Sequence, residues 1–347
     1  MNTSQAGSTV YKAGHQTSIK GGVVDVFFYE AFAEETEYLQ QYLPPGITAG
    51  FSRKTVGEHD FAEPPARLIS IRTQSIIPAS WATKLAGILT RSTGYDHLAK
   101  YLEQGNYNLP CGHLPPYCSR AVAEQAMLLW TALLRNLSGQ SKSFASFNRD
   151  GLTGWECEHK TLLVVGVGNI GYEVIKIGQG LGMQVLGVDI VEKHSVVKYA
   201  SIDQGLSVAD IIVCAMNLTA ANKYYFNYHL LKQARSGVVF VNISRGELSP
   251  SADLLRLLDE NHLGGVGLDV FNHESELADS LRDGRYSDDE EVANTLELVG
   301  RPNVICTPHN AFNTHEAIAR KSKLSIEQIS HFLKNGEFIR PVPREIT

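Results

Sequence analysis

The sequence predicts an α/β protein built from two doubly wound parallel sheets. Three observations lead to this fold class. Short apolar runs alternate with helical patterns along most of the chain, a glycine-rich turn follows one of these runs, and six candidate strands succeed one another in the middle of the chain. Alternating strands and helices are typical of βα units, and six such strands are what two mononucleotide-binding halves require.

In the first third of the chain, four apolar runs predict strands, and helical patterns lie between them. The strands are expected at Val23–Tyr29, Ile47–Phe51, Arg67–Ile71 and Gly87–Thr90, and the helices near 31–42, 78–86 and 96–104. Residues 1–22 are rich in small polar residues and lack the apolar core of a signal peptide, so we expect a flexible tail.

A Pro- and Gly-rich break covers 106–117, and the nearly uniformly apolar segment Ala121–Leu134 follows it. A helix that is apolar all round must be covered on every side, so this segment predicts a domain or subunit interface, which suggests a homodimer. The charge-rich stretch Asp279–Glu291 is expected to be a solvated loop. The six middle strands are predicted at Leu162–Val165, Val185–Asp189, Ile211–Cys214, Val238–Ile243, Gly265–Phe271 and Val304–Thr307.

The composition narrows the range of partners. The 347 residues include 37 acidic and 31 basic side chains and carry a net charge of −6. This balance argues against a nucleic-acid or membrane-surface partner, either of which requires a basic patch. No apolar run approaches the roughly 20 residues that a membrane span needs.

Five cysteines, an odd number without a CxxC pair, predict a reduced and therefore cytoplasmic protein. Cys111, His113 and Cys118 offer three zinc ligands, but no fourth is evident and two prolines lie among them. Zinc-binding sites need a fuller ligand set, so we expect a loop here and no metal.

The glycine-rich turn runs from Gly166 through Gly168 to Gly171, directly after an apolar run, and Asp189 ends the next predicted strand 23 residues after Gly166. Gly166 suits a tight turn, Gly168 allows the backbone to approach a pyrophosphate, and Gly171 allows close packing of helix on strand. The helix N-terminus offers N–H groups to the phosphates. Asp189 is placed to accept the ribose hydroxyls and to repel a 2′-phosphate, which favours NAD over NADP. The alternative is an ordinary tight turn with a solvent-facing aspartate.

Three charged residues follow the last three predicted strands, namely Arg245, Glu274 and His309. Ligands of open α/β sheets gather at the carboxyl ends of the strands, so these side chains are expected to converge. An imidazole is suited to proton transfer, a carboxylate orients it, and a guanidinium fork matches a substrate carboxylate. Taken singly, each residue has an ordinary structural explanation. Together they predict reduction of a 2-keto acid with hydride from NADH.

Beyond the glycine turn, four segments carry a family resemblance: STGYDHL at 92–98, VNISRG at 241–246, GLDVFNHE at 267–274 and HNAFNTHEA at 309–317. From about residue 23 to its end, the chain resembles the D-isomer-specific 2-hydroxyacid dehydrogenases. The last segment is similar to the D-lactate dehydrogenase branch of that family. Asn272 and Ser275 depart from the family pattern, as do Asn217 and Ser249-Pro250, but none of these changes removes a catalytic group.

The resemblance implies roles and boundaries. Arg245, Glu274 and His309 fall on catalytic positions. A Rossmann cofactor domain at 118–309 would be inserted into a flavodoxin-like substrate domain made of 23–117 and 310–347. The implied cofactor-binding residues are Gly166, Gly168, Asn169, Ile170, Gly171, Asp189, Asn217 and Asp269, the last beside the nicotinamide carboxamide. The implied substrate-binding residues are Arg72, Ser92, Thr93, Gly94, Tyr117 and Phe312, although Tyr117 and Phe312 equally suit packing at a hinge.

Two alternatives stay open. One is a family member that acts on glyoxylate, phosphoglycerate or formate. The other is a regulatory protein that senses NAD(H), like the transcriptional corepressors that share this fold. Such a protein would bind the nucleotide with little turnover.

Overall fold

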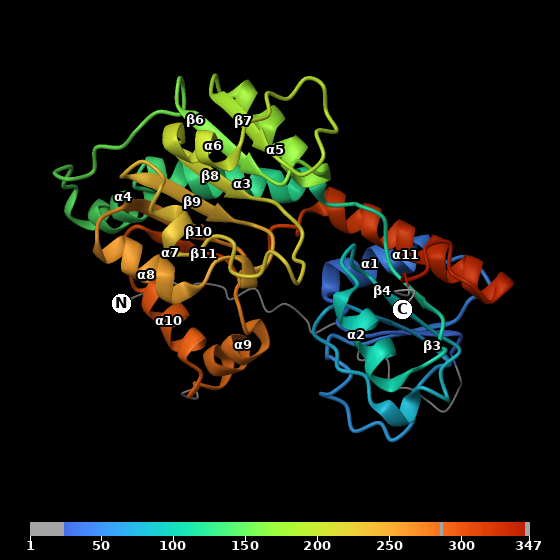
Figure 1. The fold of residues 1–347 in the computed structure, drawn as a ribbon. Coiled ribbons are helices and arrows are strands. Elements are labelled where there is room, and N and C mark those ends of the chain that lie inside the picture. The colour runs from blue at the N-terminus through green and yellow to red at the C-terminus, as the bar shows by residue number, and fades with distance from the viewer. Residues whose placement is uncertain (1–23, 285–286, 344–347) are drawn as a thin grey trace, which may run out of the picture. The chain divides into compact units, whose positions relative to one another are not determined.

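The computed structural model describes residues 24–284 and 287–343, which form two compact units (Figure 1). Within the described residues, unit 1 comprises 24–113 and 325–343, and unit 2 comprises 114–324 apart from 285 and 286. The predicted domain boundaries at 117/118 and 309/310 stay a prediction.

Unit 1 contains a five-stranded parallel sheet in the order β2-β1-β3-β4-β5. This is the 2-1-3-4-5 order of flavodoxin-like doubly wound sheets. The strands are β1 (Val26–Phe28), β2 (Ala49–Phe51), β3 (Leu68–Ile71), β4 (Gly87–Thr90) and β5 (Cys111–Gly112). The helices of this part of the chain are α1 (Ala33–Tyr42), the 3-10 turn η1 (Ala79–Trp81) and α2 (Asp96–Gly105).

The core of unit 1 is built from inward-facing strand residues and aromatic rings, among them Phe27, Tyr29 and Trp81. The long helix α11 (His315–Asn335) begins in unit 2 and ends in unit 1. In unit 1 its Phe332 ring lies against Gly87, where a Cβ atom would overlap the ring. Glycine at the start of β4 therefore allows the last turns of α11 to pack closely on the sheet.

Unit 2 contains a six-stranded parallel sheet in the order β11-β10-β9-β8-β6-β7. A further parallel bridge joins Gly187 to Tyr199 and marks a seventh position beyond β7. The strands are β6 (Thr161–Val165), β7 (Gln184–Val188), β8 (Ile211–Cys214), β9 (Val238–Asn242), β10 (Leu263–Leu268) and β11 (Val304–Cys306). The strand order turns back between β6 and β8, and such a reversal is where doubly wound sheets bind their ligands.

The two faces of this sheet carry separate cores. Along β6, Leu162 and Val164 face one core, while Leu163 and Val165 face the other. The first core includes α3 (Ser119–Leu134) and α5 (Asn169–Gly180), and the second includes α6 (Ile202–Val208), α7 (Tyr228–Leu231), α8 (Ser251–Asp259) and α10 (Glu290–Val299) (Figure 1). Alternation between two apolar faces is what a parallel strand buried on both sides requires.

Four further elements complete unit 2, namely α4 (Leu137–Ser143), η2 (Phe144–Ser146), η3 (Gly246–Leu248) and α9 (Glu274–Asp283). The apolar helix α3 packs against α5 and the sheet of its own unit, which accounts for most of its apolar surface. Leu128, however, is 51% exposed.

The structure corrects three local expectations. The break at 106–117 contains β5, because Ile88 and Leu89 pair with Cys111 and Gly112. The helix expected near 78–86 is only the short turn η1. The stretch Asp279–Glu291 is not simply a loop, because α9 ends at Asp283 and α10 begins at Glu290; residues 285 and 286 of this stretch lie outside the described residues.

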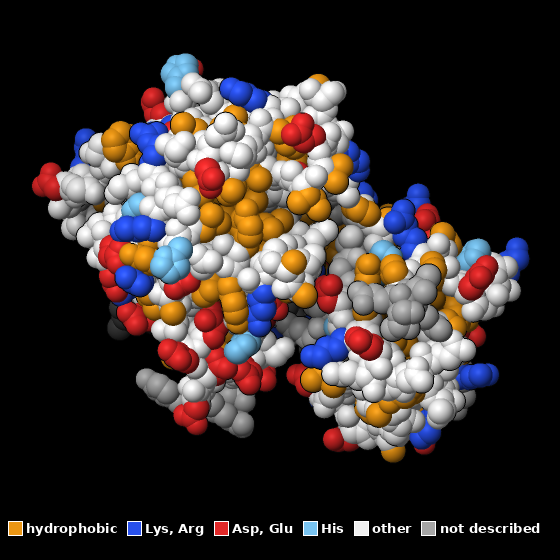
Figure 2. All heavy atoms as spheres, in the orientation of Figure 1, with side chains coloured by type: hydrophobic (Ala, Val, Ile, Leu, Met, Phe, Trp, Pro, Cys, Tyr) orange, Lys and Arg blue, Asp and Glu red, His pale blue; other side chains and the backbone are white. Residues whose placement is uncertain are grey.

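Lys and Arg side chains are scattered among Asp and Glu side chains over the coloured surface in Figure 2. No helix among the described residues is both long and apolar enough to cross a membrane. Because the net charge is negative and the basic side chains are scattered, an anionic ligand would depend on a local cation, as expected from the sequence.

Candidate active site

The glycine turn has the geometry that a dinucleotide pyrophosphate requires. Gly166 has a φ of +93°, and a Cβ there would lie 2.5 Å from the Met216 Cα. A Cβ on Gly171 would overlap the Gly166 carbonyl oxygen, so only glycine lets α5 pack this closely. A Cβ on Gly168 would meet nothing within 4 Å. The space above Gly168 is therefore open to a ligand. Asn169 and Ile170 are the first residues of α5, and their N–H groups face this space.

Asp189 follows β7 and braces this turn. Its Oδ2 accepts a hydrogen bond from the Val167 N–H at 2.6 Å, and its Oδ1 accepts one from the Val191 N–H at 3.0 Å. A carboxylate has about four acceptor positions, so two positions remain for ribose hydroxyls. The residues present therefore fit NAD.

The loop after β8 backs the glycine turn. Met216 lies against Gly166, and the exposed Asn217 follows it. The Asn217 carbonyl oxygen accepts a hydrogen bond from Asn222 Nδ2 at 2.7 Å. Asn217 thus stands at the carboxyl end of β8, on the same edge as the glycine turn.

Arg245 follows β9, and a buried asparagine shapes its loop. Asn242 Oδ1 accepts from the Ser244 N–H at 3.0 Å, and Asn242 Nδ2 donates to the Arg245 carbonyl oxygen at 2.9 Å. The half-buried Arg245 donates from Nη1 to the Ser244 carbonyl oxygen at 2.9 Å. Asn242 was not among the predicted site residues, although its place in the VNISRG segment was a signal.

Asp269 follows β10, is only 1% exposed, and organises the turn after β11. Its carboxylate accepts hydrogen bonds from Thr307 Oγ1 at 2.6 Å and from the N–H groups of Asn310 and Ala311 at 2.9 Å each. Burial raises the pKa of Asp269, and these hydrogen bonds oppose the rise. The aspartate therefore holds the Thr307 side chain before His309 and the backbone directly after it.

His309 and Glu274 form a close pair, as their place at strand ends predicts. His309 Nδ1 lies 2.9 Å from both carboxylate oxygens of Glu274. A carboxylate only accepts, so Nδ1 carries the proton and Nε2 is left for other chemistry. Glu274 is the first residue of α9, and His309 adopts a left-handed backbone with φ +49°. Because β9, β10 and β11 are adjacent and parallel, Arg245, Asp269 and His309 all follow strands that end at one edge.

Tyr117 and Phe312 are held by the first turns of α11. Arg320 Nε donates to the Tyr117 carbonyl oxygen at 2.8 Å, and Lys321 Nζ lies 5.2 Å from the centroid of the Phe312 ring. Both contacts lie within unit 2.

In unit 1, the predicted substrate-binding residues follow β3 and β4. Ser92 Oγ donates to the Gly94 carbonyl oxygen at 2.6 Å, and the Thr93 carbonyl oxygen accepts from His113 Nδ1 at 3.2 Å. The Arg72 guanidinium lies over the Phe32 ring, 5.5 Å from its centroid. Arg72 and Ser92–Gly94 thus share the carboxyl edge of the unit 1 sheet.

Cys111 and His113, two of the three candidate zinc ligands, have other contacts in the structure. Cys111 lies in β5, and His113 bonds Thr93 and packs on Tyr95. Within the described ranges, a single group has the spacing of metal ligands, namely His273, Glu276 and Asp289. Asp289 is the N-cap of α10 and also bonds His273 at 2.8 Å, which gives this group a structural role. Hydrogen bonds from Val292 foremost, and also from His273, hold the pKa of Asp289 below its usual range.

Comparison with known proteins identifies the class. Residues 127–311, more than half of the chain, match the family model of the NAD-binding domain of D-isomer specific 2-hydroxyacid dehydrogenases. The chain belongs to this family and is an NAD-dependent dehydrogenase of 2-hydroxy acids.

Individual relatives agree with this assignment. The D-lactate dehydrogenase of Escherichia coli strain K12 is 31% identical over 65% of this chain and 69% of its own length. An aromatic 2-oxoacid reductase of Clostridium sporogenes is 28% identical over 72% of this chain and 76% of its own length. The crystal structure of an Aquifex aeolicus D-lactate dehydrogenase with NAD and lactic acid superposes with a TM-score of 0.77 at 26% identity, covering 91% of this chain and 99% of that one.

Proposed function

We propose that this dehydrogenase reduces small 2-keto acids to D-2-hydroxy acids in the manner of a D-lactate dehydrogenase. The observation that carries the proposal is the His309–Glu274 pair, at the sheet edge that also bears Arg245 and the open glycine turn. Relatives named for D-lactate and for aromatic 2-oxoacids support this substrate class.

His309 is the proton donor in this proposal. Glu274 holds the Nδ1–H of the ring at 2.9 Å, so Nε2 carries the transferable proton of the imidazolium. When bound, NADH would supply the hydride that the carbonyl carbon accepts. The substrate carbonyl oxygen takes the proton from His309 Nε2 and becomes the hydroxyl group. In the reverse direction a neutral His309 accepts that proton, so oxidation is favoured at higher pH than reduction.

Arg245 binds the substrate carboxylate and polarises its carbonyl. A guanidinium presents parallel N–H donors that match a carboxylate, and Asn242 fixes the loop that carries it. The proposed substrate contacts are completed by Arg72, Ser92, Thr93, Gly94, Tyr117 and Phe312.

The proposed cofactor residues follow from the turn and the strand ends. Gly166, Gly168, Asn169, Ile170 and Gly171 form the pyrophosphate site. Asp189 accepts the ribose hydroxyls, and its charge disfavours the 2′-phosphate of NADP. Asn217 and Asp269 complete the set.

An initial-rate assay tests the substrate class. Oxidation of NADH is followed with pyruvate, phenylpyruvate and 2-ketoisocaproate, and then with glyoxylate; oxidation of 3-phosphoglycerate and formate is followed with NAD. The proposal predicts the highest kcat/KM with one of the first three acids. A preference for glyoxylate, phosphoglycerate or formate would assign the enzyme a different substrate of the same family. Tight NADH binding without turnover of any acid would contradict it and favour a sensor of NAD(H).

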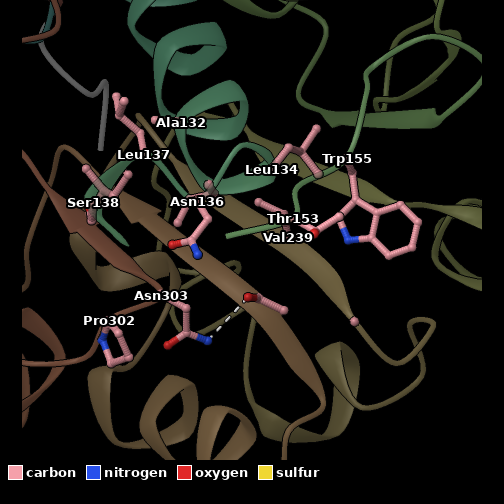
Figure 3. A pocket seen from close by; sticks show the side chains of 14 residues that line it. Ala132, Leu134, Asn136, Leu137, Ser138, Thr153, Trp155, Val239, Pro302 and Asn303 are labelled. Carbon is pink, nitrogen blue, oxygen red and sulfur yellow. Dashed lines mark hydrogen bonds between the residues drawn. The ribbon is translucent and has the colours of Figure 1, made fainter. Parts of the chain in front are cut away.

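We further propose that the enzyme is a homodimer formed through the outer side of α3 and α4. A cavity of about 350 Å³ lies among Leu134, Asn136, Trp155 and Asn303, at the amino ends of β9, β10 and β11 (Figure 3). Five large hydrophobic side chains are exposed between residues 128 and 155, and two of them, Leu137 and Trp155, line this cavity. The five are Leu128, Leu137, Phe144, Phe147 and Trp155. Exposed apolar surface of this kind is typical of subunit interfaces.

Light scattering after size-exclusion chromatography tests the dimer. The double substitution Leu128→Glu and Leu137→Glu is expected to give a folded monomer. Ile339→Glu is the control, because Ile339 is exposed to a similar degree but lies in unit 1. A wild-type monomer, or an unchanged dimer in the double variant, would contradict this interface.

We also propose a cytoplasmic location, which is supported by the five cysteines because none of them is joined in a disulfide. Fractionation of cells that express the full chain, with activity measured in each fraction, tests it. Activity confined to a secreted or membrane fraction would contradict it.

A further inference from the structure

Glu30 is a buried carboxylate in an unusual backbone conformation at the substrate edge of unit 1. It lies two residues after the end of β1, its φ is +53°, and it is only 8% exposed. Residues other than glycine rarely adopt this left-handed conformation, and those that do are held there by their surroundings and cluster at functional sites.

The carboxylate of Glu30 holds the turn that follows β3. Its Oε2 accepts hydrogen bonds from the Arg72 N–H at 2.9 Å and from Ser75 Oγ at 2.5 Å, and its Oε1 accepts one from the Gln74 N–H at 3.2 Å. The Glu30 N–H donates to the Lys54 carbonyl oxygen at 3.0 Å, which anchors the residue from its other side. Both carboxylate oxygens are thus engaged by one short turn.

These contacts fix the direction of the turn. Glu30 accepts hydrogen bonds from the N–H groups of Arg72 and Gln74. It accepts none from the N–H group of Thr73, which lies between them in the chain. Phe32, two residues after Glu30, lies under the Arg72 guanidinium. The backbone and the side chain of Arg72 are therefore both held by the segment that begins at Glu30.

The turn lies where a substrate is expected. It follows β3, and the Ser92–Gly94 loop follows the neighbouring strand β4, so both loops lie at the carboxyl edge of one parallel sheet. Ligands of open α/β sheets bind at this edge.

We propose that Glu30 is a positioning residue for the keto acid. It does not touch the substrate; it holds the 72–75 turn so that Arg72 meets the substrate in one orientation. The proposal rests on the proposed function, which places Arg72 at the substrate. It predicts that Glu30 acts on substrate affinity and leaves the cofactor site in unit 2 unaffected.

Two substitutions of Glu30 separate this role from a purely structural one. Glu30→Gln keeps the size of the side chain but replaces one acceptor oxygen by an amide NH₂ group, which would face the donors of the 72–75 turn. Glu30→Gly removes the carboxylate and suits the left-handed backbone, so this variant is expected to fold even if the first does not. Glu37→Gln on α1 is the matched control, because Glu37 is an exposed glutamate of the same unit.

Steady-state kinetics with pyruvate and NADH, and inhibition by oxamate, give the readouts. Both Glu30 variants are expected to raise the KM for pyruvate and the Ki for oxamate about tenfold, the effect of losing a hydrogen bond to a charged group. The KM for NADH, and the kcat at saturating pyruvate, should change less than about twofold, within the error of such energy estimates. Glu37→Gln should match the wild type.

Three results would overturn the inference. A wild-type KM for pyruvate in Glu30→Gly would exclude positioning, and so would equal changes in the KM for both pyruvate and NADH. A lower Tm with unchanged kinetics would show that Glu30 serves only stability. In each case an active wild-type enzyme leaves the proposed function standing. A wild-type protein that turns over no keto acid would instead refute the proposed function, and this inference with it.

Discussion

Replacing Glu274 by glutamine removes a negative charge beside His309 and keeps an oxygen that can accept the Nδ1–H. The charged form of this contact is short, with Nδ1 2.9 Å from both carboxylate oxygens. A hydrogen bond between charged groups contributes about 1.5–3 kcal/mol. The side chains of His309 and Glu274 are 35% and 32% exposed, so solvent screening favours the lower part of that range. A loss of about 1.5–2 kcal/mol lowers kcat by roughly 10–30-fold.

Glu274→Ala removes the acceptor as well as the charge. The ring can then turn, and either nitrogen can carry the proton. We expect kcat to fall by about 10²–10⁴, the range for loss of a general acid. Initial rates of pyruvate reduction are measured for both variants at saturating NADH. The comparison separates the effect of the Glu274 charge from the effect of ring orientation. Glu276→Gln on the same helix is the control, because Glu276 is exposed. Glu274→Ala with the kcat of the wild type would refute the assigned role of this pair.

Three further predictions concern other residues of unit 2. Asp189→Asn should raise the ratio of kcat/KM for NADPH over NADH about tenfold, because the repulsion of a 2′-phosphate is removed; an unchanged ratio would exclude Asp189 as the selecting group. Asp269→Asn should lower the free energy of unfolding in urea by about 1–3 kcal/mol and also lower kcat, because one buried acceptor of the turn at His309 is lost; a variant that is stable and fully active would contradict this. Burial raises the pKa of the Cys118 thiol to about 11 and those of Cys214 and Cys306 to about 12, from 9.0. Their contribution to stability is therefore complete below pH 9.0 and is lost as the pH rises through these values; a urea midpoint that stays constant above pH 9.0 would contradict it.

The strands and the glycine turn were predictable because local sequence specifies them. Each strand of unit 2 is a short apolar run, and the spacing of Gly166, Gly168 and Gly171 reflects three separate steric demands. By contrast, β5 is two residues long. It depends on pairing with β4 and on a bridge from Gly112 to Pro341, contacts that no local pattern reveals.

The candidate site was predictable only in part. Strand ends indicated Arg245, Glu274 and His309, because the topology of a parallel sheet brings such ends to one edge. The residues that hold them were not indicated. In the sequence, Asn242 and Thr307 look like ordinary polar residues. Their roles depend on hydrogen bonds, from Asn242 to the loop after β9 and from Thr307 to Asp269 after β10. The start of α9 at Glu274 was also hidden, because the charge-rich stretch in its second half suggested a loop.

The apolar helix at 119–134 shows that apolar composition alone does not locate a subunit interface. Its character suggested an interface on every side, yet α5 and the sheet of the same unit cover most of it. Leu128 stays exposed on α3 and is the part of the helix available to the proposed dimer interface. The helical pattern of apolar residues does not distinguish Leu128 from its buried neighbours.

The proposed mechanism requires His309 to donate the proton that accompanies hydride transfer. Single-turnover reduction of pyruvate by the His309→Gln variant, preloaded with NADH, tests it most directly. We expect a rate about 10²–10⁴-fold lower than that of the wild type, with an unchanged Kd for NADH. A variant that oxidises NADH at the rate of the wild type would contradict it.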